Sequence, residues 1–358
     1  MSTMTATTTS PMQFDVGSGM GSRKVREPEG HASFDEIPII DLSDMDSNDE
    51  AKLRALASKI YDVCTQVGFF YIKNHGISPE TVAQIKREAE RFLKGMPLDK
   101  KMDVVRDNNE FFLGYAPFRP HGNALNKKPH PYEAFLCGRE VAWDPECRGT
   151  VDSTHDAHNL WPAGEDIPGF KAQVGNYFGQ MLVLCRKMAR LFALSLELDP
   201  HFFDDKLQKP AAILALNYYA AQSAENPEVK TGIRTHTDHE LFTILLQSDG
   251  VSALEVVNGN GDWIPAKPLQ DTFVVNIGDA LSIWTNNIFL STLHRATNTS
   301  SEERYSIPFF FGPDYDCVME TLPSCVSETR PLLYKPITQR EHYLSKMNTA
   351  YGDTSVAA

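Results

Sequence analysis

The sequence predicts an α+β fold in which an antiparallel β-sandwich or barrel follows a helical N-terminal part. After Pro210 the chain consists of short apolar segments separated by turns, one of them at residues 258–261 (NGNG). The segments are AAILALNYYA, HELFTILLQ, ALEVV, GDWIPA, TFVVNIGD, FLSTLHRATN and RYSIPFFF. Closely spaced strands of this kind are typical of an antiparallel sandwich or barrel. The longest apolar stripe at helical spacing, residues 167–198, comes before them and predicts a helix that braces the sheet.

The chain opens with a segment without regular pattern and continues with alternating strands and helices. Residues 1–35 are rich in Ser, Thr, Gly, Pro and Met, and we expect a disordered tail because they bury little apolar surface. Strands are expected over 37–42 and 69–72, separated by a helical pattern that reaches Cys64. Ser78-Pro79-Glu80 provides an N-cap, a proline and an acid in the first turn, which predicts a helix to about residue 94.

Long loops are expected over residues 106–165, which contain many Pro, Gly, Asn and His, around one or two short strands near 132–139. Irregular segments inside an enzyme commonly line its pocket, so we expect this one to form part of the substrate site. The predicted divisions are a tail (1–35), an N-terminal region with substrate-lining loops (36–165), the bracing helix and its connection (166–209), the β-rich core (210–315) and a C-terminal segment (316–358).

Composition agrees with a soluble, cytoplasmic enzyme. The chain has 358 residues, a formal net charge of −13 and a pI near 5.3, which argues against a nucleic-acid surface. Six cysteines occur without C-x-x-C spacing, so we expect buried, reduced thiols. No apolar run approaches the roughly 20 residues of a membrane span, and no secretory signal pattern opens the chain. Nothing in the composition implies a protein partner.

The most informative residues are His236, Asp238 and His294. Side chains at i and i+2 of a strand share a face, so His236 and Asp238 can converge while Thr237 points away, and a second strand can bring His294 beside them. Two imidazoles and one carboxylate with open coordination positions suit non-haem Fe(II) used for oxygen chemistry. His239 has odd spacing from His236, and we interpret it as structural rather than as a ligand.

These residues lie in an ordered set of segments: GIRTHTDHELFTILLQ, DWIPAKP, VVNIGDALSIWTNN, STLHRATN and ERYSIPFFFGP. Over residues 210–315 the chain resembles the 2-oxoglutarate- and Fe(II)-dependent dioxygenases, in the isopenicillin N synthase-like branch that includes thymine hydroxylase and plant flavonoid and gibberellin oxygenases. The early segments IPIIDLS and GFFYIKNHGI resemble the N-terminal non-haem dioxygenase region of that family. The resemblance implies a double-stranded β-helix (jelly roll), Fe(II), and 2-oxoglutarate and O2 as cosubstrates, with succinate and CO2 released.

A carboxylate clamp is predicted at Arg304 and Ser306, which share a face at i and i+2. The guanidinium fork matches a carboxylate with two charge-assisted hydrogen bonds, and a nearby hydroxyl can add a third. The resemblance implies that this carboxylate belongs to 2-oxoglutarate. It also implies that Tyr219 and Asn217, in the LNYY segment, contact the cosubstrate, although Ala220 stands where many plant members have proline.

The substrate is predicted to be a small, mostly apolar organic metabolite, as in secondary metabolism, because the candidate pocket residues are aromatic and aliphatic. The candidates are Phe112, Tyr115, Tyr132, Phe135, Ile213 and Phe311. Ile213 is included because its even spacing from Asn217 places both on one face of a strand. Hydroxylation, desaturation and related outcomes remain open.

Three alternatives remain open from the residues. An oxidase resembling isopenicillin N synthase would keep the metal triad and the Arg304/Ser306 pair but use no 2-oxoglutarate. A non-enzymatic jelly roll would bind only a metal or small ligand. A zinc hydrolase would also use two histidines and one carboxylate, but the chain has no H-E-x-x-H helix.

Overall fold

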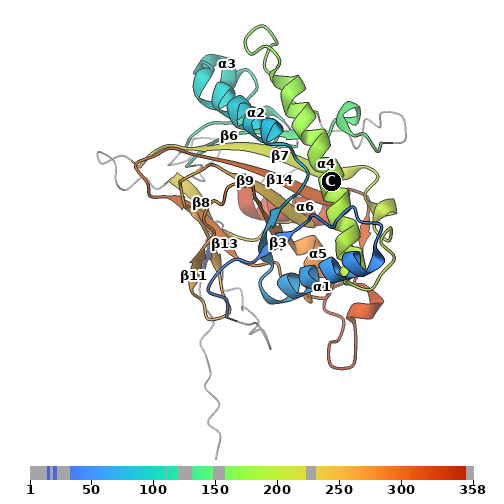
Figure 1. Ribbon diagram of the computed structural model, residues 1–358. Coiled ribbons are helices and arrows are strands. Elements are labelled where there is room, and N and C mark those ends of the chain that lie inside the picture. Colours follow the sequence, from blue (N-terminus) through green and yellow to red (C-terminus); the bar gives the residue numbers. More distant parts are fainter. Residues whose placement is uncertain are drawn as a thin grey trace, which may run out of the picture.

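In a computed structural model, two β-sheets that face each other form the centre of the protein. The structure describes residues 14–16, 19–21, 33–109, 111–119, 131–147, 158–222 and 231–351. Apolar side chains of both sheets meet between them, among them Phe69 and Val274 from the larger sheet and Leu254 and Val256 from the smaller. Helices cover the outer face of the larger sheet (Figure 1). This α+β arrangement agrees with the sandwich that the strand pattern predicts.

The larger sheet has eight strands in the order β3-β4-β12-β9-β14-β7-β6-β5. The β3–β4 pair is parallel, and the other pairs are antiparallel. The strands are β3 (Ile39–Asp41), β4 (Phe69–Lys73), β5 (Gly114–Ala116), β6 (Glu133–Gly138), β7 (Pro210–Tyr219), β9 (Phe242–Gln247), β12 (Phe273–Ile277) and β14 (Arg304–Asp314). Except for β5, each lies in a segment where the sequence predicts a strand.

The smaller sheet has the order β11-β10-β13-β8-β1-β2. Its strands are β8 (Thr231–His236), β10 (Leu254–Val257), β11 (Trp263–Pro265), β13 (His294–Asn298), β1 (Phe14–Val16) and β2 (Gly19–Gly21), and a separate pair consists of β15 (Val318–Met319) and β16 (Ile337–Thr338). β1 pairs in parallel with β8, where it supplies a neighbour to a strand that would otherwise be an edge. The expected tail without regular structure is therefore wrong at β1 and β2; residues 1–13, 17–18 and 22–32 of that segment lie outside the described residues.

The helices pack mainly against the outer face of the larger sheet. They are α1 (Glu50–Gln66), α2 (Pro79–Glu90), α3 (Leu98–Met102), α4 (Phe170–Ser195), α5 (Asp279–Trp284) and α6 (Gln339–Tyr351), with a π-helical turn at Arg91–Gly95 and 3₁₀ turns at Arg106–Asn108, Val141–Trp143, Asp204–Lys206 and Pro323–Cys325. The predicted helix start is confirmed, since the Ser78 side chain accepts from the Thr81 amide and Pro79 follows it. α4 braces the sheet as predicted, with the Phe178 ring 4.8 Å from that of Phe309.

Strand alternation divides the larger sheet into two chemically different faces. On β14, Ile307, Phe309 and Phe311 belong to the core under the helices. Arg304 and Ser306, at the other parity, share the inner face that looks toward the smaller sheet. The polar residues of β7 and β14 are thereby gathered inside the sandwich.

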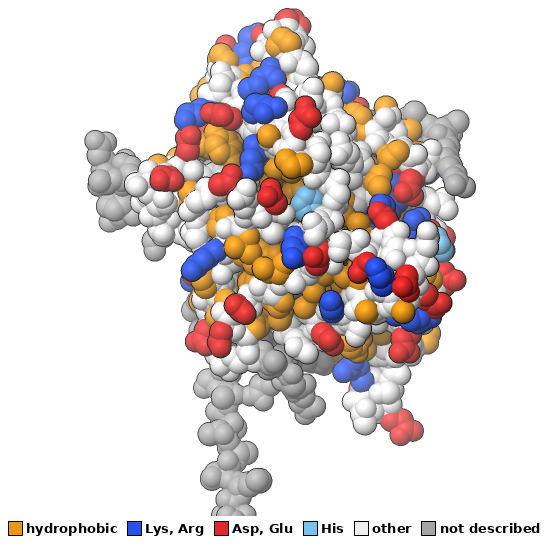
Figure 2. All heavy atoms as spheres, in the orientation of Figure 1, with side chains coloured by type: hydrophobic (Ala, Val, Ile, Leu, Met, Phe, Trp, Pro, Cys, Tyr) orange, Lys and Arg blue, Asp and Glu red, His pale blue; other side chains and the backbone are white. Residues whose placement is uncertain are grey.

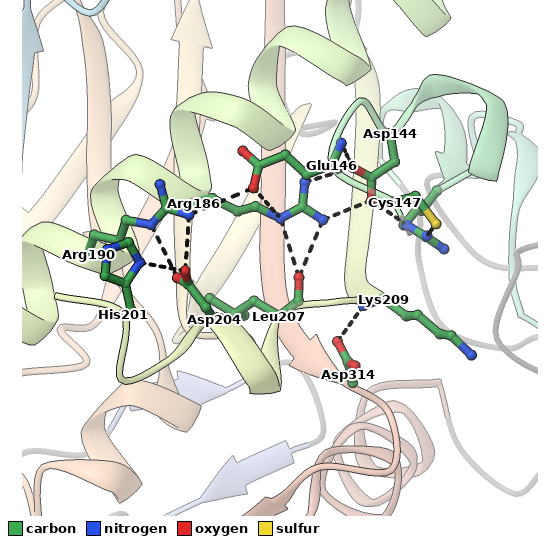
Figure 3. Close-up of polar contacts among 11 residues, drawn as sticks. Asp144, Glu146, Cys147, Arg186, Arg190, His201, Asp204, Leu207, Lys209 and Asp314 are labelled. Carbon is green, nitrogen blue, oxygen red and sulfur yellow. Dashed lines mark hydrogen bonds and ion pairs between the residues drawn. The ribbon is translucent and has the colours of Figure 1, made fainter. Parts of the chain in front are cut away.

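A buried ion-pair cluster fastens the irregular residues 139–147 to α4 (Figure 3). The Asp144 side chain is fully buried and accepts two hydrogen bonds from Arg186, at 2.7 and 2.8 Å, and one from Arg139, at 3.0 Å. Burial raises the pKa of Asp144, but the two arginines outweigh it and hold that pKa below its ordinary value. Because Asp144 is paired with a helix residue, the segment that leads out of β6 has a fixed position.

The surface carries mixed charges. On the face shown in Figure 2, acidic and basic side chains are interspersed around apolar side chains near the centre. Among the described residues, no helix has the length and apolar character needed to cross a membrane.

Candidate metal centre and cosubstrate pocket

His236, Asp238 and His294 converge at one end of the sandwich. His236 is the last residue of β8, His294 is the first of β13, and the two are directly paired. Their Nε2 atoms lie 3.6 Å and 3.7 Å from the Asp238 Oδ1 atom, and one ligand atom from each residue fits within a 4.8 Å span. The expectation that His236 and Asp238 lie on one strand is wrong, because β8 ends at His236; the loop that follows turns Asp238 back to the same point.

Each candidate ligand is held by a second contact. The Nδ1 atoms of His236 and His294 lie 2.7 Å and 3.2 Å from the backbone carbonyls of Arg234 and Thr292, which leaves both Nε2 atoms facing Asp238. Such contacts set the tautomer and the ring orientation of a metal-binding histidine.

Asp238 is oriented in the same way. Its Oδ2 atom accepts hydrogen bonds from the Thr243 hydroxyl and from the Asn276 amide, the latter at 2.8 Å. The other oxygen, Oδ1, is thereby directed toward the two imidazoles. Thr243 on β9 and Asn276 on β12 were not predicted from the sequence, because each lies in a strand that is otherwise mostly apolar.

The electrostatics favour the protonation states that bind a metal. Burial and the neighbouring His236 lower the pKa of His294 to about 4, so this imidazole is neutral at pH 7. Burial alone would raise the pKa of Asp238, but His294 and His236, with the hydrogen bonds from Thr243 and Asn276, bring it below its ordinary value. A neutral imidazole and an ionised carboxylate are the forms that coordinate a metal.

His239 does not join the cluster. Among the described residues, only His236, Asp238 and His294 form a group of three possible ligands. Burial lowers the pKa of His239 to about 4, and its Nδ1 atom has no hydrogen-bond partner within the described part of the chain. Its position agrees with our interpretation of a structural residue.

The predicted carboxylate clamp lies on the inner face of β7 and β14. Arg304 is paired with Tyr219 and Ser306 with Asn217, and directly opposite residues of antiparallel strands project to the same face. All four are buried, and Arg304 is only 1% exposed.

Arg304 is the most unusual of these residues. Its guanidinium carbon lies 5.0 Å from the centre of the Tyr219 ring, and the Tyr219 phenol is its hydrogen-bond neighbour. Its Nε and Nη1 atoms have no partner among the described residues, and burial lowers its pKa. A buried cation with unused donors fits an anionic ligand, and the planar fork fits a carboxylate.

Gln247 is a further inner-face residue that sequence reasoning missed. It is paired with Ser306, donates to the Ala266 carbonyl at 3.1 Å, and has a buried Oε1 atom without a partner in the described residues. A polar residue at the end of the apolar segment FTILLQ was the available signal.

The predicted substrate residues divide between the two faces. Tyr132 stacks on Tyr219 at 5.2 Å, and Ile213 lies on the inner face because it has the parity of Asn217. Phe112 has a positive φ of 57°, and its role stays a prediction. Phe310, paired with Ile213, is an inner-face residue that was not predicted.

Three of the predicted substrate residues face the other way. Tyr115, Phe135 and Phe311 are fully buried in the core under the helices, where Phe135 packs 4.7 Å from Phe92. Side chains alternate between the two faces of a strand, and each of these three residues occupies a position whose side chain points to the helices. Their assignment to the substrate pocket is therefore wrong.

The comparisons with known proteins agree with this site. Residues 210–313 match the model described as 2OG-Fe(II) oxygenase superfamily, and residues 37–164 match the one described as non-haem dioxygenase in morphine synthesis N-terminal. The chain is 36% identical over 352 residues to a 2-oxoglutarate-Fe(II) type oxidoreductase, ppzC, of Metarhizium majus, and the match covers 92% of both chains. The chain belongs to the 2OG-Fe(II) oxygenase superfamily.

Further relatives of this oxygenase support the same family. Homoarginine-6-hydroxylase 2-ODD-233 of Oryza sativa subsp. japonica is 31% identical, over 89% of this chain and 99% of that protein. Neurospora crassa T7H, crystallised with alpha-KG and thymine, is 29% identical with a TM-score of 0.75, over 88% of this chain and 97% of that one.

The family confirms several predictions. The 2OG-Fe(II) oxygenase is an oxidoreductase with a jelly-roll core, and it uses Fe(II), 2-oxoglutarate and O2. The 2-oxoglutarate-independent oxidase, the binding module and the zinc hydrolase are accordingly not favoured.

Proposed function

We propose that His236, Asp238 and His294 bind the Fe(II) of this oxygenase. The observation that carries the proposal is the convergence of two Nε2 atoms on Asp238 Oδ1. The Nδ1 atoms of both histidines contact backbone carbonyls, and Asp238 Oδ2 accepts from Asn276, so these atoms are directed away from the point of convergence. Two imidazoles and a carboxylate with open coordination positions are the donor set that suits Fe(II) in oxygenases. When bound, the metal and the 2-oxo acid supply the oxidising chemistry.

Arg304, Ser306, Tyr219 and Asn217 are proposed to bind 2-oxoglutarate. The unused donors of the buried Arg304 support this assignment, since a carboxylate placed beside the guanidinium would accept from it. Ser306 and Asn217 lie two cross-strand pairs further into the strands than Arg304 and Tyr219, so both pairs project to the same face. The four side chains would thus fix the far carboxylate and align the cosubstrate along the inner face.

The substrate is proposed to be a small, mostly apolar metabolite. Ile213 and Phe310 supply apolar surface on the inner face, and Tyr132 continues it from the segment that precedes β6. A pocket with this lining excludes water and positions an apolar ligand through its shape. We also propose a reducing, cytoplasmic location, because all six cysteines are free and four of them are buried.

The test is substrate-dependent succinate formation with Fe(II) and 2-oxoglutarate. The panel should hold apolar organic acids and terpenoid-like compounds beside homoarginine and thymine, which the names of relatives and neighbours suggest. We expect turnover with an apolar compound and none after Asp238→Ala. Turnover confined to homoarginine would contradict the proposed substrate class, and full turnover in Asp238→Ala would contradict the metal assignment.

A further inference from the structure

The C-terminal helix α6 makes a partly buried contact next to the metal centre, in which the Lys346 side chain is 29% exposed. Lys346 Nζ lies 2.6 Å from Asp279 Oδ2, and the Asp279 side chain is only 7% exposed. Asp279 is the first residue of α5, far from Lys346 in sequence. The ion pair therefore connects the end of the described chain to the middle of the catalytic core.

Asp279 in turn contacts both segments that carry candidate metal ligands. Its Oδ2 atom accepts a hydrogen bond from Thr237, which lies between His236 and Asp238, at 3.2 Å. Its Oδ1 atom accepts one from Ser291, three residues before His294, at 2.6 Å. The Asp279 carboxylate thus contacts both the loop that carries Asp238 and the segment that leads to His294.

Backbone contacts bring the start of α5 unusually close to the metal-binding loop. The Asp279 amide donates to the Asp238 carbonyl at 2.8 Å, and the Gly278 amide donates to the Leu241 carbonyl at 2.8 Å. A Cβ atom at Gly278 would lie 2.1 Å from the Glu240 carbonyl oxygen, so only glycine permits this approach. A shift of Asp279 would therefore be transmitted to the loop.

A second residue of α6 approaches the same loop. His342, one helical turn before Lys346, is buried and forms a hydrogen bond with the backbone of His239. Residues four apart share one face of a helix, so a single face of α6 makes both contacts.

We propose that Lys346 is a positioning residue for the metal centre, acting through Asp279 on the segments that hold His236, Asp238 and His294. Its ammonium group neutralises a buried carboxylate and fixes the oxygen to which Thr237 also bonds. Without it, Asp279 would draw in water or turn outward to reach it, which would loosen both segments. The inference rests on the proposed metal assignment and extends it to the C-terminal helix.

The experiment compares Lys346→Met, Lys346→Arg and Arg340→Met in the full chain. Arg340 is the matched control, because it is also on α6 and its ion-pair partner is the exposed Asp316, at 3.2 Å, instead of the buried Asp279. The Fe(II) dissociation constant is measured anaerobically, and hydrogen exchange is measured on the metal-free proteins. We expect Lys346→Met to weaken Fe(II) binding about 10- to 100-fold, as loss of a residue supporting metal ligands commonly does.

Exchange distinguishes positioning from general destabilisation. In metal-free Lys346→Met, the amides of residues 278–280 should exchange faster, while those of β12 stay protected as in the wild type. Lys346→Arg should restore Fe(II) binding and protection, and Arg340→Met should alter neither. Wild-type Fe(II) affinity and wild-type protection at 278–280 in Lys346→Met would overturn the proposal, and so would equal losses in Arg340→Met.

Failure of the metal assignment would give a different result. If Asp238→Ala bound Fe(II) as tightly as the wild type, the triad would be wrong, whatever Lys346→Met did. If Lys346→Met did not fold, Thr237→Val removes the same link from the loop side with little change in volume. Unchanged Fe(II) binding in a folded Thr237→Val protein would then overturn the positioning role.

Discussion

Replacement of Arg304 by methionine should abolish tight binding of 2-oxoglutarate without unfolding the protein. Methionine keeps much of the apolar stem and removes a buried cation whose Nε and Nη1 atoms are unpartnered in the described residues. The fork can make two charge-assisted hydrogen bonds to a carboxylate, each contributing about 1.5–3 kcal/mol. Their loss amounts to about 3–6 kcal/mol, which corresponds to roughly 10²- to 10⁴-fold weaker binding, since about 1.4 kcal/mol is tenfold.

Anaerobic calorimetry with Fe(II)-loaded protein measures this effect directly. Arg304→Lys should fall between the wild type and Arg304→Met, because lysine is a point charge without the fork. Arg295→Met is the matched control, since Arg295 lies on β13 of the smaller sheet, which is not paired with β14, and its partner is Glu255 at 2.8 Å. Wild-type affinity in Arg304→Met, or an equal loss in Arg295→Met, would refute the clamp.

The remaining predictions concern stability, the pocket and the metal ligands. Asp144→Asn should lower the free energy of unfolding by about 3–5 kcal/mol at pH 7, because it removes the buried carboxylate charge that Arg186 and Arg139 both contact. The folded-state pKa of Asp144 is below its unfolded value, so the stabilisation by Asp144 is complete above the unfolded pKa and disappears as pH falls through the folded pKa. Urea unfolding at several pH values should therefore show that the difference in unfolding free energy between wild type and Asp144→Asn becomes smaller in acid. Phe310→Ala should raise the KM for substrate, whereas Phe311→Ala should cost about 3–5 kcal/mol of stability and leave KM unchanged, as thermal unfolding and kinetics would reveal. Asn276→Ala should weaken Fe(II) binding about tenfold, measured by anaerobic titration, and unchanged affinity would contradict its role.

The spacing of the clamp residues carries geometric information, whereas the triad was predicted from its residue types and the family resemblance, because β8 ends at His236 and the strand argument for Asp238 does not hold. Arg304 and Ser306 have the strand period of two, and the structure places them on one face, opposite Tyr219 and Asn217. The same rule, applied to Phe311, would have excluded it, since it has odd spacing from Ser306. An aromatic side chain can face either the helices or the pocket, so residue type alone does not identify the pocket residues, whereas their position along the strand does.

Other parts of the site depend on pairings that the sequence does not encode. Thr243 and Asn276 reach Asp238 only because β9 and β12 are neighbours in the register that the fold sets. Lys346 reaches Asp279 through the packing of α6. Such contacts join residues from separate elements, so neither periodicity nor local motifs predict them.

The central claim is that the triad and the Arg304 clamp form one site. Its most direct test is the charge-transfer absorption of the anaerobic protein with Fe(II) and 2-oxoglutarate. The band requires metal and cosubstrate to be bound together. We predict a weak visible band in the wild type, no band in Asp238→Ala, and a band in Arg304→Met only at much higher 2-oxoglutarate concentration. A full band in Asp238→Ala, or none in wild-type protein that binds both Fe(II) and 2-oxoglutarate, would contradict this account.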